Sequence, residues 1–141
     1  MDRDETEPSP TEGGFIATRI DDLPTFAVAP GITGRTLPAT DLIRAWAYDF
    51  APGTRWPTTD RHVFEERYYV ASGEIDDNGT SYPAGTYVVF SPGTSHRPGS
   101  RSGGRMIGMS DARDPGDVDA EWRRPERGSA LSSPVIPQGV D

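Results

Sequence analysis

The sequence contains neither cysteine nor lysine, and these two absences exclude several kinds of chemistry. Without thiols the chain has no disulfide framework, thiolate zinc finger, iron–sulfur cluster or cysteine nucleophile. Without an amine side chain it cannot form a Schiff base with a carbonyl substrate. The 14 arginines are outnumbered by 22 acidic residues, which gives a formal net charge of −8. This balance argues against a nucleic-acid partner, which requires clustered positive charge.

Long apolar runs are also missing. None approaches the roughly 18 residues needed to span a bilayer, and the polar start from Met1 to Glu5 has no feature of a signal peptide. We therefore expect a cytoplasmic protein without a membrane partner. The 141 residues allow one small domain. The 16 glycines and 14 prolines are spread along the chain without a repeat, which predicts many turns and little helix.

The negative charge is concentrated at the two ends of the chain. The first twelve residues hold five acids and one arginine, and the stretch from residue 111 onward holds seven acids and four arginines. We expect a disordered acidic tail over residues 1–14, a folded domain over residues 15–110 and an irregular C-terminal tail over residues 111–141. In the second tail, Trp122 and Val135-Ile136 offer apolar groups for docking on a neighbouring surface.

Between the tails, the sequence has the pattern of short β-strands. The stretch from Asp41 to Phe50 has Arg44 as a single polar interruption and places four apolar residues on one face at a period of two: Leu42, Trp46, Tyr48 and Phe50. Further strands are predicted over residues 64–71, ending at Ser72-Gly73, over residues 73–79, running into an Asn-Gly turn, and over residues 86–90 and 106–109.

Short strands separated by Gly and Pro turns are typical of an all-β sandwich or barrel, and not of a parallel sheet with crossover helices. A folded region of roughly 100 residues buries only a marginal core, and small barrels often extend that core by pairing. We therefore expect a homodimer.

Two motifs surround the only histidines. In the first, Asp60-Arg61-His62 is followed after three residues by Glu66, and after six more by Gly73. In the second, Gly85 is followed after five residues by Ser91-Pro92-Gly93, and after two more by His96. These spacings resemble the two motifs of the cupin family. The first of those runs Gly, five residues, His-x-His, three or four residues, Glu, six residues, Gly. The second runs Gly, five residues, Pro-x-Gly, two residues, His, three residues, Asn.

The chain departs from the cupin pattern at four positions. Asp60 stands where the family has its first histidine, and Gly53 lies one residue from the expected glycine. Ser91 and Ser100 replace the usual proline and asparagine of the second motif. The resemblance covers roughly residues 40–110 and implies a small antiparallel jelly-roll (cupin) barrel.

The stretch from Gly73 to Pro98 more narrowly resembles the cupin domains at the C-terminal ends of certain anti-sigma factors and their stand-alone relatives. Those relatives include enzymes that cleave β-diketones and hydroxyacetophenones with oxygen. The sigma-binding zinc domain of the anti-sigma factors has no counterpart in the sequence, so we do not expect that role here.

The residues themselves also point to a metal. His62, Glu66 and His96 form a 2-His-1-carboxylate set, which suits a non-haem Fe(II) centre with open positions. Residues 60 and 62 of a strand point to the same face, so Asp60 either adds a fourth ligand or stays off the metal as a general base. Two carboxylates favour harder ions such as Fe(II), Mn(II) or Ni(II). The expected cofactor is one divalent metal, first Fe(II), with Zn, Ni or Mn as alternatives. The same alternation turns Glu65 outward. The contrary interpretation is a barrel that has lost its metal and binds a small ligand in its interior.

Aromatic residues on the predicted strands are candidates for a substrate cup. Core packing is the first expectation for Tyr48, Tyr68 and Phe90. If they face a cavity, the two tyrosines would donate a phenolic proton to a substrate carbonyl. Arg105 is a weaker candidate, for pairing with an anionic substrate.

Three functions remain open at this point. The resemblance implies first a metal-dependent enzyme, an Fe(II) dioxygenase, acting on a small carbonyl or enolisable molecule of aromatic or polyketide-like type. A second hypothesis is a non-redox cyclase, isomerase or lyase, in which a metal polarises a carbonyl and Asp60 or a tyrosine moves the proton. The third is a module that binds a small ligand or a metal without catalysis, because the fold alone does not decide function.

Overall fold

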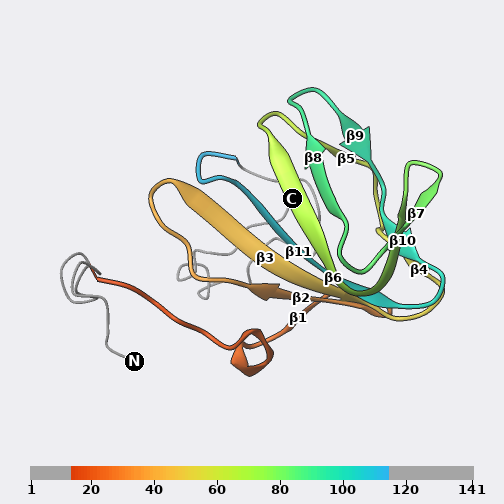
Figure 1. Ribbon diagram of the computed structural model, residues 1–141, viewed down its shortest axis with the longest axis horizontal. Coiled ribbons are helices and arrows are strands. Elements are labelled where there is room, and N and C mark those ends of the chain that lie inside the picture. Colours follow the sequence, from red (N-terminus) through yellow and green to blue (C-terminus); the bar gives the residue numbers. More distant parts are fainter. Residues whose placement is uncertain (1–13, 115–141) are drawn as a thin grey trace, which may run out of the picture.

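The computed structural model describes residues 14–114, of which about half lie in antiparallel β-strands and most of the rest in turns and loops (Figure 1). The helix in this part of the chain is a single 3-10 turn, η1 (Ile20–Asp22), so none there is long and apolar enough to cross a membrane. The strands are β1 (Phe26–Ala29), β2 (Ile32–Thr36), β3 (Ile43–Phe50), β4 (Thr54–Arg55), β5 (Asp60–Arg61), β6 (Glu66–Asp77), β7 (Thr80–Pro83), β8 (Tyr87–Phe90), β9 (Ser95–His96), β10 (Gly99–Ser100) and β11 (Gly104–Asp111).

Three long strands form the middle of the sheet, with β11 paired between β3 and β6. Strands β2 and β1 continue the sheet beyond β3, while β8 and β7 pair with the first and last parts of β6. The sheet is curled, and the short strands β5 and β9 pair with each other apart from it (Figure 1). This curled antiparallel arrangement is the all-β jelly-roll barrel that the sequence predicts.

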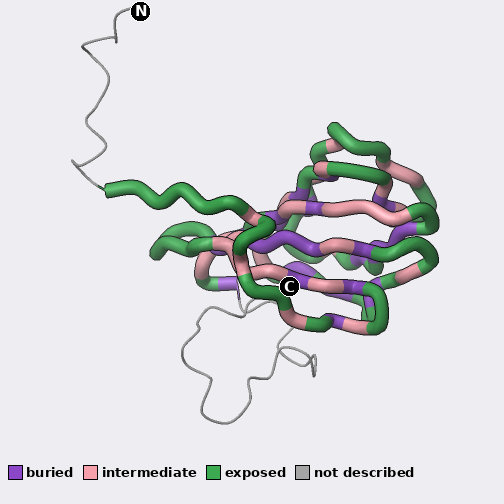
Figure 2. Tube along the Cα trace, turned by 90° about the horizontal axis from the view of Figure 1, so that it is seen from below, coloured by how far each residue is buried: buried purple, intermediate pink, exposed green. Residues whose placement is uncertain are grey.

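The core lies inside the curl of the sheet. In β3 every second residue from Arg44 to Phe50 is buried, and Tyr48 packs edge-on against Trp56 with ring centroids 4.7 Å apart. Burial of such rings is the main source of stability in a small barrel. Figure 2 shows the buried residues along the strands and the exposed ones at the loops and in the N-terminal segment. The rest of the apolar core includes Val28, Ile32, Trp46, Tyr68, Val70, Ile75, Phe90 and Met106.

The start of β3 differs from its prediction. Leu42 lies before the strand and is 77% exposed, because its amide donates a hydrogen bond to Thr40 Oγ1 in a local turn. Arg44, the expected polar interruption, is buried, and its Nε donates a hydrogen bond to the backbone carbonyl of Asp114. The inward face of β3 therefore begins at Arg44 and not at Leu42.

The predicted end of the strand at Ser72-Gly73 is wrong, because β6 continues to Asp77. The pairing of β6 with β11 shifts register just before this point. Val70 lies opposite Met106 and Ser72 opposite Arg105, so Ala71 is an extra residue, as at a β-bulge. Gly73 has a φ of 64°, and a Cβ on it would overlap the carbonyl oxygen of Gly103. Even-numbered residues point inward before the bulge, whereas Ile75 and Asp77 point inward after it.

The strands predicted over residues 86–90 and 106–109 are confirmed as β8 and as the central part of β11. Several shorter strands had no prediction, because segments of two to five residues carry little alternation. Most of the two predicted tails, residues 1–13 and 115–141, lies outside the described residues. The predicted docking of Trp122 and Val135-Ile136 also lies outside the described residues.

Candidate metal centre

Four buried side chains meet at one point inside the barrel. Each offers one ligand atom, and these atoms all lie within 4.8 Å of one another. None of the four residues is more than 5% exposed. Metal–ligand bonds of about 2 Å bring the ligand atoms of one ion about 3–4 Å apart, so the cluster has nearly the size of a mononuclear site. Its members are the four residues that the sequence proposes as ligands: Asp60, His62, Glu66 and His96.

Backbone pairing fixes the positions of these side chains. Asp60 in β5 is the cross-strand partner of His96 in β9. His62 extends this pairing, because its amide donates to the Thr94 carbonyl and its carbonyl accepts from the Gly93 amide. The two sequence motifs therefore meet in this short antiparallel strand pair. Glu66, the first residue of β6, supplies the remaining carboxylate from the main sheet.

The carboxylates lie close to the imidazole nitrogens. His62 Nδ1 is 3.2 Å from Glu66 Oε1 and 4.0 Å from Asp60 Oδ2. His96 Nε2 is 3.8 Å from Asp60 Oδ2 and 4.0 Å from Glu66 Oε2. Among the described residues, the buried His62 Nε2 and Glu66 Oε1 have no hydrogen-bond partner. Buried polar atoms are rarely left in this state, so a divalent cation fits this donor set in both charge and ligand type.

Burial and neighbouring charges shift the pKa values of the cluster. Burial lowers the pKa of His62 to about 4, so its ring is neutral and able to act as a ligand at neutral pH. Burial, together with the Asp60 carboxylate, raises the pKa of Glu66 well above its usual value. Burial opposes the charging of His96, but the carboxylates of Asp60 and Asp77 outweigh it and raise its pKa to about 9. Protons on His96 and Glu66 therefore compete with a cation for the same atoms.

A third acid, Asp77, stands behind the cluster. Its Oδ2 lies 2.7 Å from His96 Nδ1 and accepts a hydrogen bond of 2.8 Å from the Tyr68 hydroxyl. Burial, then the Asp77 carboxylate, raises the pKa of Tyr68, so this hydroxyl keeps its proton. Sequence reasoning missed Asp77, because simple alternation from Glu66 turns an odd-numbered residue outward and only the bulge at Ala71 turns it inward. No local sequence signal reveals that change.

The cavity beside the cluster is small. It has a volume of about 10 Å³, which holds no more than one water-sized group. Tyr48 lines it, together with Trp46, Trp56, Asp60, Glu66, His96, Pro98 and Met106. Phe90 packs on His96 instead, with ring centroids 4.3 Å apart. Tyr68 is turned to Asp77, so of the three aromatic candidates only Tyr48 reaches the cavity.

Arg105 does not face the cluster. Its Nε lies 2.7 Å from Asp49 Oδ1, and its second terminal nitrogen lies 2.7 Å from Asp21 Oδ1. These two acids account for its charge and tie β11 to β3 and to the residues around η1. Arg105 therefore forms ion pairs that link parts of the fold. It does not face the four-residue cluster, where it would have to lie to bind an anionic substrate.

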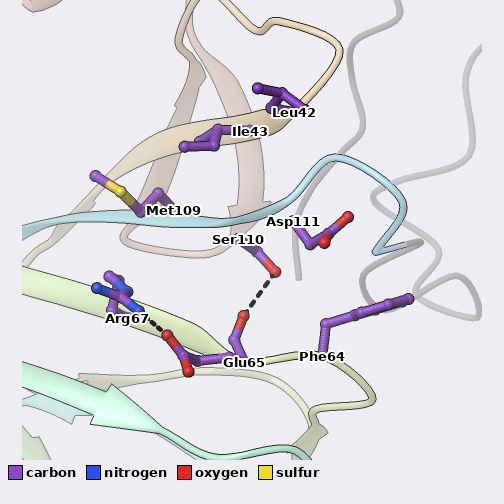
Figure 3. Close-up of a pocket in the computed structure, with 8 residues that line it drawn as sticks. All are labelled: Leu42, Ile43, Phe64, Glu65, Arg67, Met109, Ser110 and Asp111. Atoms are coloured by element: carbon purple, nitrogen blue, oxygen red, sulfur yellow. Dashed lines mark hydrogen bonds and ion pairs between the residues drawn. The ribbon is translucent and has the colours of Figure 1, made fainter.

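A larger groove lies on the outside of the barrel (Figure 3). It has a volume of about 460 Å³, and Glu65 lines it. Glu65, directly before β6, is exposed whereas Glu66, the first residue of β6, is buried, so the groove and the four-residue cluster lie on opposite sides of the chain here. The outward orientation expected for Glu65 is confirmed. The other lining residues are Leu42, Ile43, Phe64, Arg67, Met109, Ser110 and Asp111.

Known structures with the same fold have several functions. The polyketide cyclase RemF from Streptomyces resistomycificus is 16% identical, with a TM-score of 0.63 over 72% of this chain and 82% of that chain. The anti-sigma ChrR of Rhodobacter sphaeroides, in complex with SigE, is 19% identical, with a TM-score of 0.60 over 77% and 58%. Salicylate 1,2-dioxygenase from Pseudoaminobacter salicylatoxidans is 19% identical, with a TM-score of 0.55 over 62% and 26%.

At these identities the similarities concern the fold alone. A comparison with curated protein sequences gave no match. The family comparison is more specific, because residues 14–111, nearly the whole described part of the chain, match the model of the ChrR cupin-like domain. The chain therefore belongs to the ChrR cupin-like domain family of the cupin superfamily.

Proposed function

We propose that this protein is a mononuclear metal-dependent cupin enzyme that holds its ion with Asp60, His62, Glu66 and His96. The observation that carries this proposal is the convergence of four buried ligand atoms within 4.8 Å. An ion bound there would supply Lewis-acid polarisation of a carbonyl and, if it is iron, redox chemistry with O₂. Fe(II) is our first choice because two imidazoles and two carboxylates suit it, with Mn, Ni and Zn as alternatives.

The reaction that we propose first is dioxygenation of a small carbonyl or enolisable substrate. A salicylate dioxygenase of the same fold supports this class of reaction. The cavity of about 10 Å³ limits what can reach the cluster in this conformation to a single small group, such as one carbonyl oxygen. The buried rings of Trp46 and Trp56 line that cavity. An aromatic or polyketide-like substrate therefore requires these side chains to move aside.

A non-redox reaction is the second candidate, and the position of Asp60 favours it. Asp60 borders the cavity and also lies within 4.0 Å of both imidazoles. A carboxylate in this place serves either as a ligand or as a base that takes a proton from an entering substrate. A polyketide cyclase of the same fold supports a reaction of this class. Binding without catalysis is the third candidate, which the closed cavity favours.

Metal analysis of protein purified without a chelator tests the proposal. We expect about one equivalent of a divalent metal per chain and oxygen uptake with a β-diketone if the metal is iron. Zinc or nickel without oxygen uptake would favour the non-redox reaction. Absence of any metal from the wild-type protein, after incubation with each ion in turn, would overturn both enzymatic proposals. Glu66→Gln should lose the metal, whereas Glu65→Gln, a neighbouring change on the outer face, should retain it.

The proposed partner is a small molecule, and we propose no nucleic-acid or membrane partner. The homodimer expected from the small core also stays a proposal, which sedimentation at several protein concentrations would test. A cytoplasmic location is likewise proposed from the sequence alone.

A further inference from the structure

We infer that Asp77 is a positioning residue that selects the tautomer of His96 and so aims its Nε2 lone pair at the metal. This inference rests on the proposed metal site. Asp77 is 1% exposed and contacts the ring of His96, so it would act through the imidazole.

The hydrogen bond between the two residues defines the tautomer. A carboxylate oxygen only accepts hydrogen bonds, so the 2.7 Å contact between Asp77 Oδ2 and His96 Nδ1 requires the proton to be on Nδ1. In the neutral ring the lone pair is then on Nε2, which is the nitrogen that faces Asp60 and Glu66. With the opposite tautomer, a proton would occupy the position of the ion.

The Tyr68 hydroxyl makes this arrangement rigid. It donates to the same oxygen of Asp77, so that oxygen accepts from two donors. The Tyr68 ring also lies nearly parallel to the His96 ring, at 19° with centroids 6.2 Å apart, and Phe90 packs on His96 from 4.3 Å. The imidazole is therefore held both by packing and by a fixed acceptor, which is how outer partners orient metal-binding histidines.

The cost of burying Asp77 argues that it does more than stabilise the fold. Among the described residues its Oδ1 is buried without a hydrogen-bond partner. A buried carboxylate with an unsatisfied oxygen opposes folding, and an apolar side chain would fill this position at lower cost. The bulge at Ala71 reverses the alternation of β6 and so turns Asp77 inward.

Asp77→Asn tests the inference, because asparagine has the same shape but its amide group donates to Nδ1 and stabilises the wrong tautomer. We expect Zn(II) affinity, measured by competition with a chelator, to fall about 10- to 100-fold. Asp76→Asn is the matched control, since its carboxylate accepts from the Arg101 amide at the surface, and its affinity should stay within about twofold of wild type. Tyr68→Phe should weaken binding less than Asp77→Asn does.

Nitrogen-15 spectra of histidine-labelled protein give a readout that a merely structural role would not change. The chain has two histidines, so each ring is resolved. We expect the zinc-loaded wild type to show a protonated Nδ1 and a metal-bound Nε2 for His96, and Asp77→Asn to lose that Nδ1 proton signal. Wild-type affinity and an unchanged His96 tautomer in a folded Asp77→Asn protein would overturn the inference.

The failure of the proposed function is distinguishable from the failure of this inference. If the wild type binds no metal, the proposed function fails, and spectra of the metal-free protein at a pH above 9 then decide the tautomer. A proton on Nδ1 in wild type and on Nε2 in Asp77→Asn would support the role of Asp77. The same tautomer in both proteins would refute it.

Discussion

Asp60 and His96 are direct cross-strand partners in the β5–β9 pair, with Asp60 Oδ2 3.8 Å from His96 Nε2. Asp60 occupies the position of the first histidine in the cupin pattern, so a carboxylate replaces a neutral ring at the same backbone site. Since neighbouring side chains on one face of a strand pair approach to about 5 Å, the pairing by itself brings the two motifs into one site. The replacement puts a carboxylate, which can carry a negative charge, in the place of a neutral ring.

Asp60→Ala separates the two roles open to this carboxylate. We expect it to weaken metal binding at least about tenfold, because it removes one of four converging ligands, while His96→Ala abolishes binding. Isothermal titration with Zn(II) and metal analysis measure both effects. Full occupancy with lost turnover in Asp60→Ala would instead identify Asp60 as the base. Glu65→Gln serves as the control on the opposite side of the chain.

The metal-free protein should lose stability as the pH rises. His96 has a folded pKa of about 9 against an ordinary value of 6.5, so between these values only the folded state holds its proton. The stabilisation is fully present below pH 6.5 and is lost as the pH rises through 9, an effect on the order of 3 kcal/mol. Glu66, whose pKa is also raised, acts in the same direction.

Chemical unfolding with a chelator present, at a series of pH values, measures this decline. His96→Gln should flatten the curve between pH 6.5 and 9, because glutamine does not titrate. A wild-type curve that stays level over this window would contradict the raised pKa of His96.

Metal affinity should change with pH in the opposite direction. The ion must displace the proton of His96, so binding tightens as the pH rises towards 9 and releases protons into the buffer. Calorimetric titrations with Zn(II) in buffers of different ionisation enthalpy count the released protons. The apparent affinity should increase up to about tenfold per pH unit below 9. An affinity independent of pH from 6.5 to 9 would show that His96 is neutral or not a ligand.

Gly73→Ala should destabilise the fold strongly. Gly73 has a φ of 64°, and an added Cβ would overlap the Gly103 carbonyl oxygen and lie 2.7 Å from Gly104 Cα. We expect a loss of about 3 kcal/mol or more in the free energy of unfolding, because backbone cannot move aside as a flexible side chain does. Gly53→Ala is the control: its φ is 82°, nothing lies within 4 Å of the added Cβ, and its cost should be about 1 kcal/mol. Equal losses in thermal unfolding would refute the steric role of Gly73.

Features of the site that depend on residues close together in the sequence could be predicted, whereas features that depend on distant residues could not. His62, Glu66 and Glu65 alternate along one short stretch, so their inward and outward directions could be predicted from spacing. Leu42 was misplaced because a turn at Thr40 ends the alternation before the strand begins. The hydrogen bonds of Arg105 could not be predicted, because Asp49 and Asp21 lie far from it in the sequence and form no motif with it.

The sequence by itself determined the available chemistry, the all-β class and the candidate metal ligands. With no thiol, no amine side chain and two histidines, few catalytic groups exist, and their spacing within two motifs depends only on neighbouring residues. Tertiary structure alone decided that the cavity beside the ligands is nearly filled and that Asp77 stands behind His96. Both depend on long-range contacts: the bulge at Ala71 exists only where β6 pairs with β11, and the cavity is small because rings of β3 meet the ring of Trp56 in it.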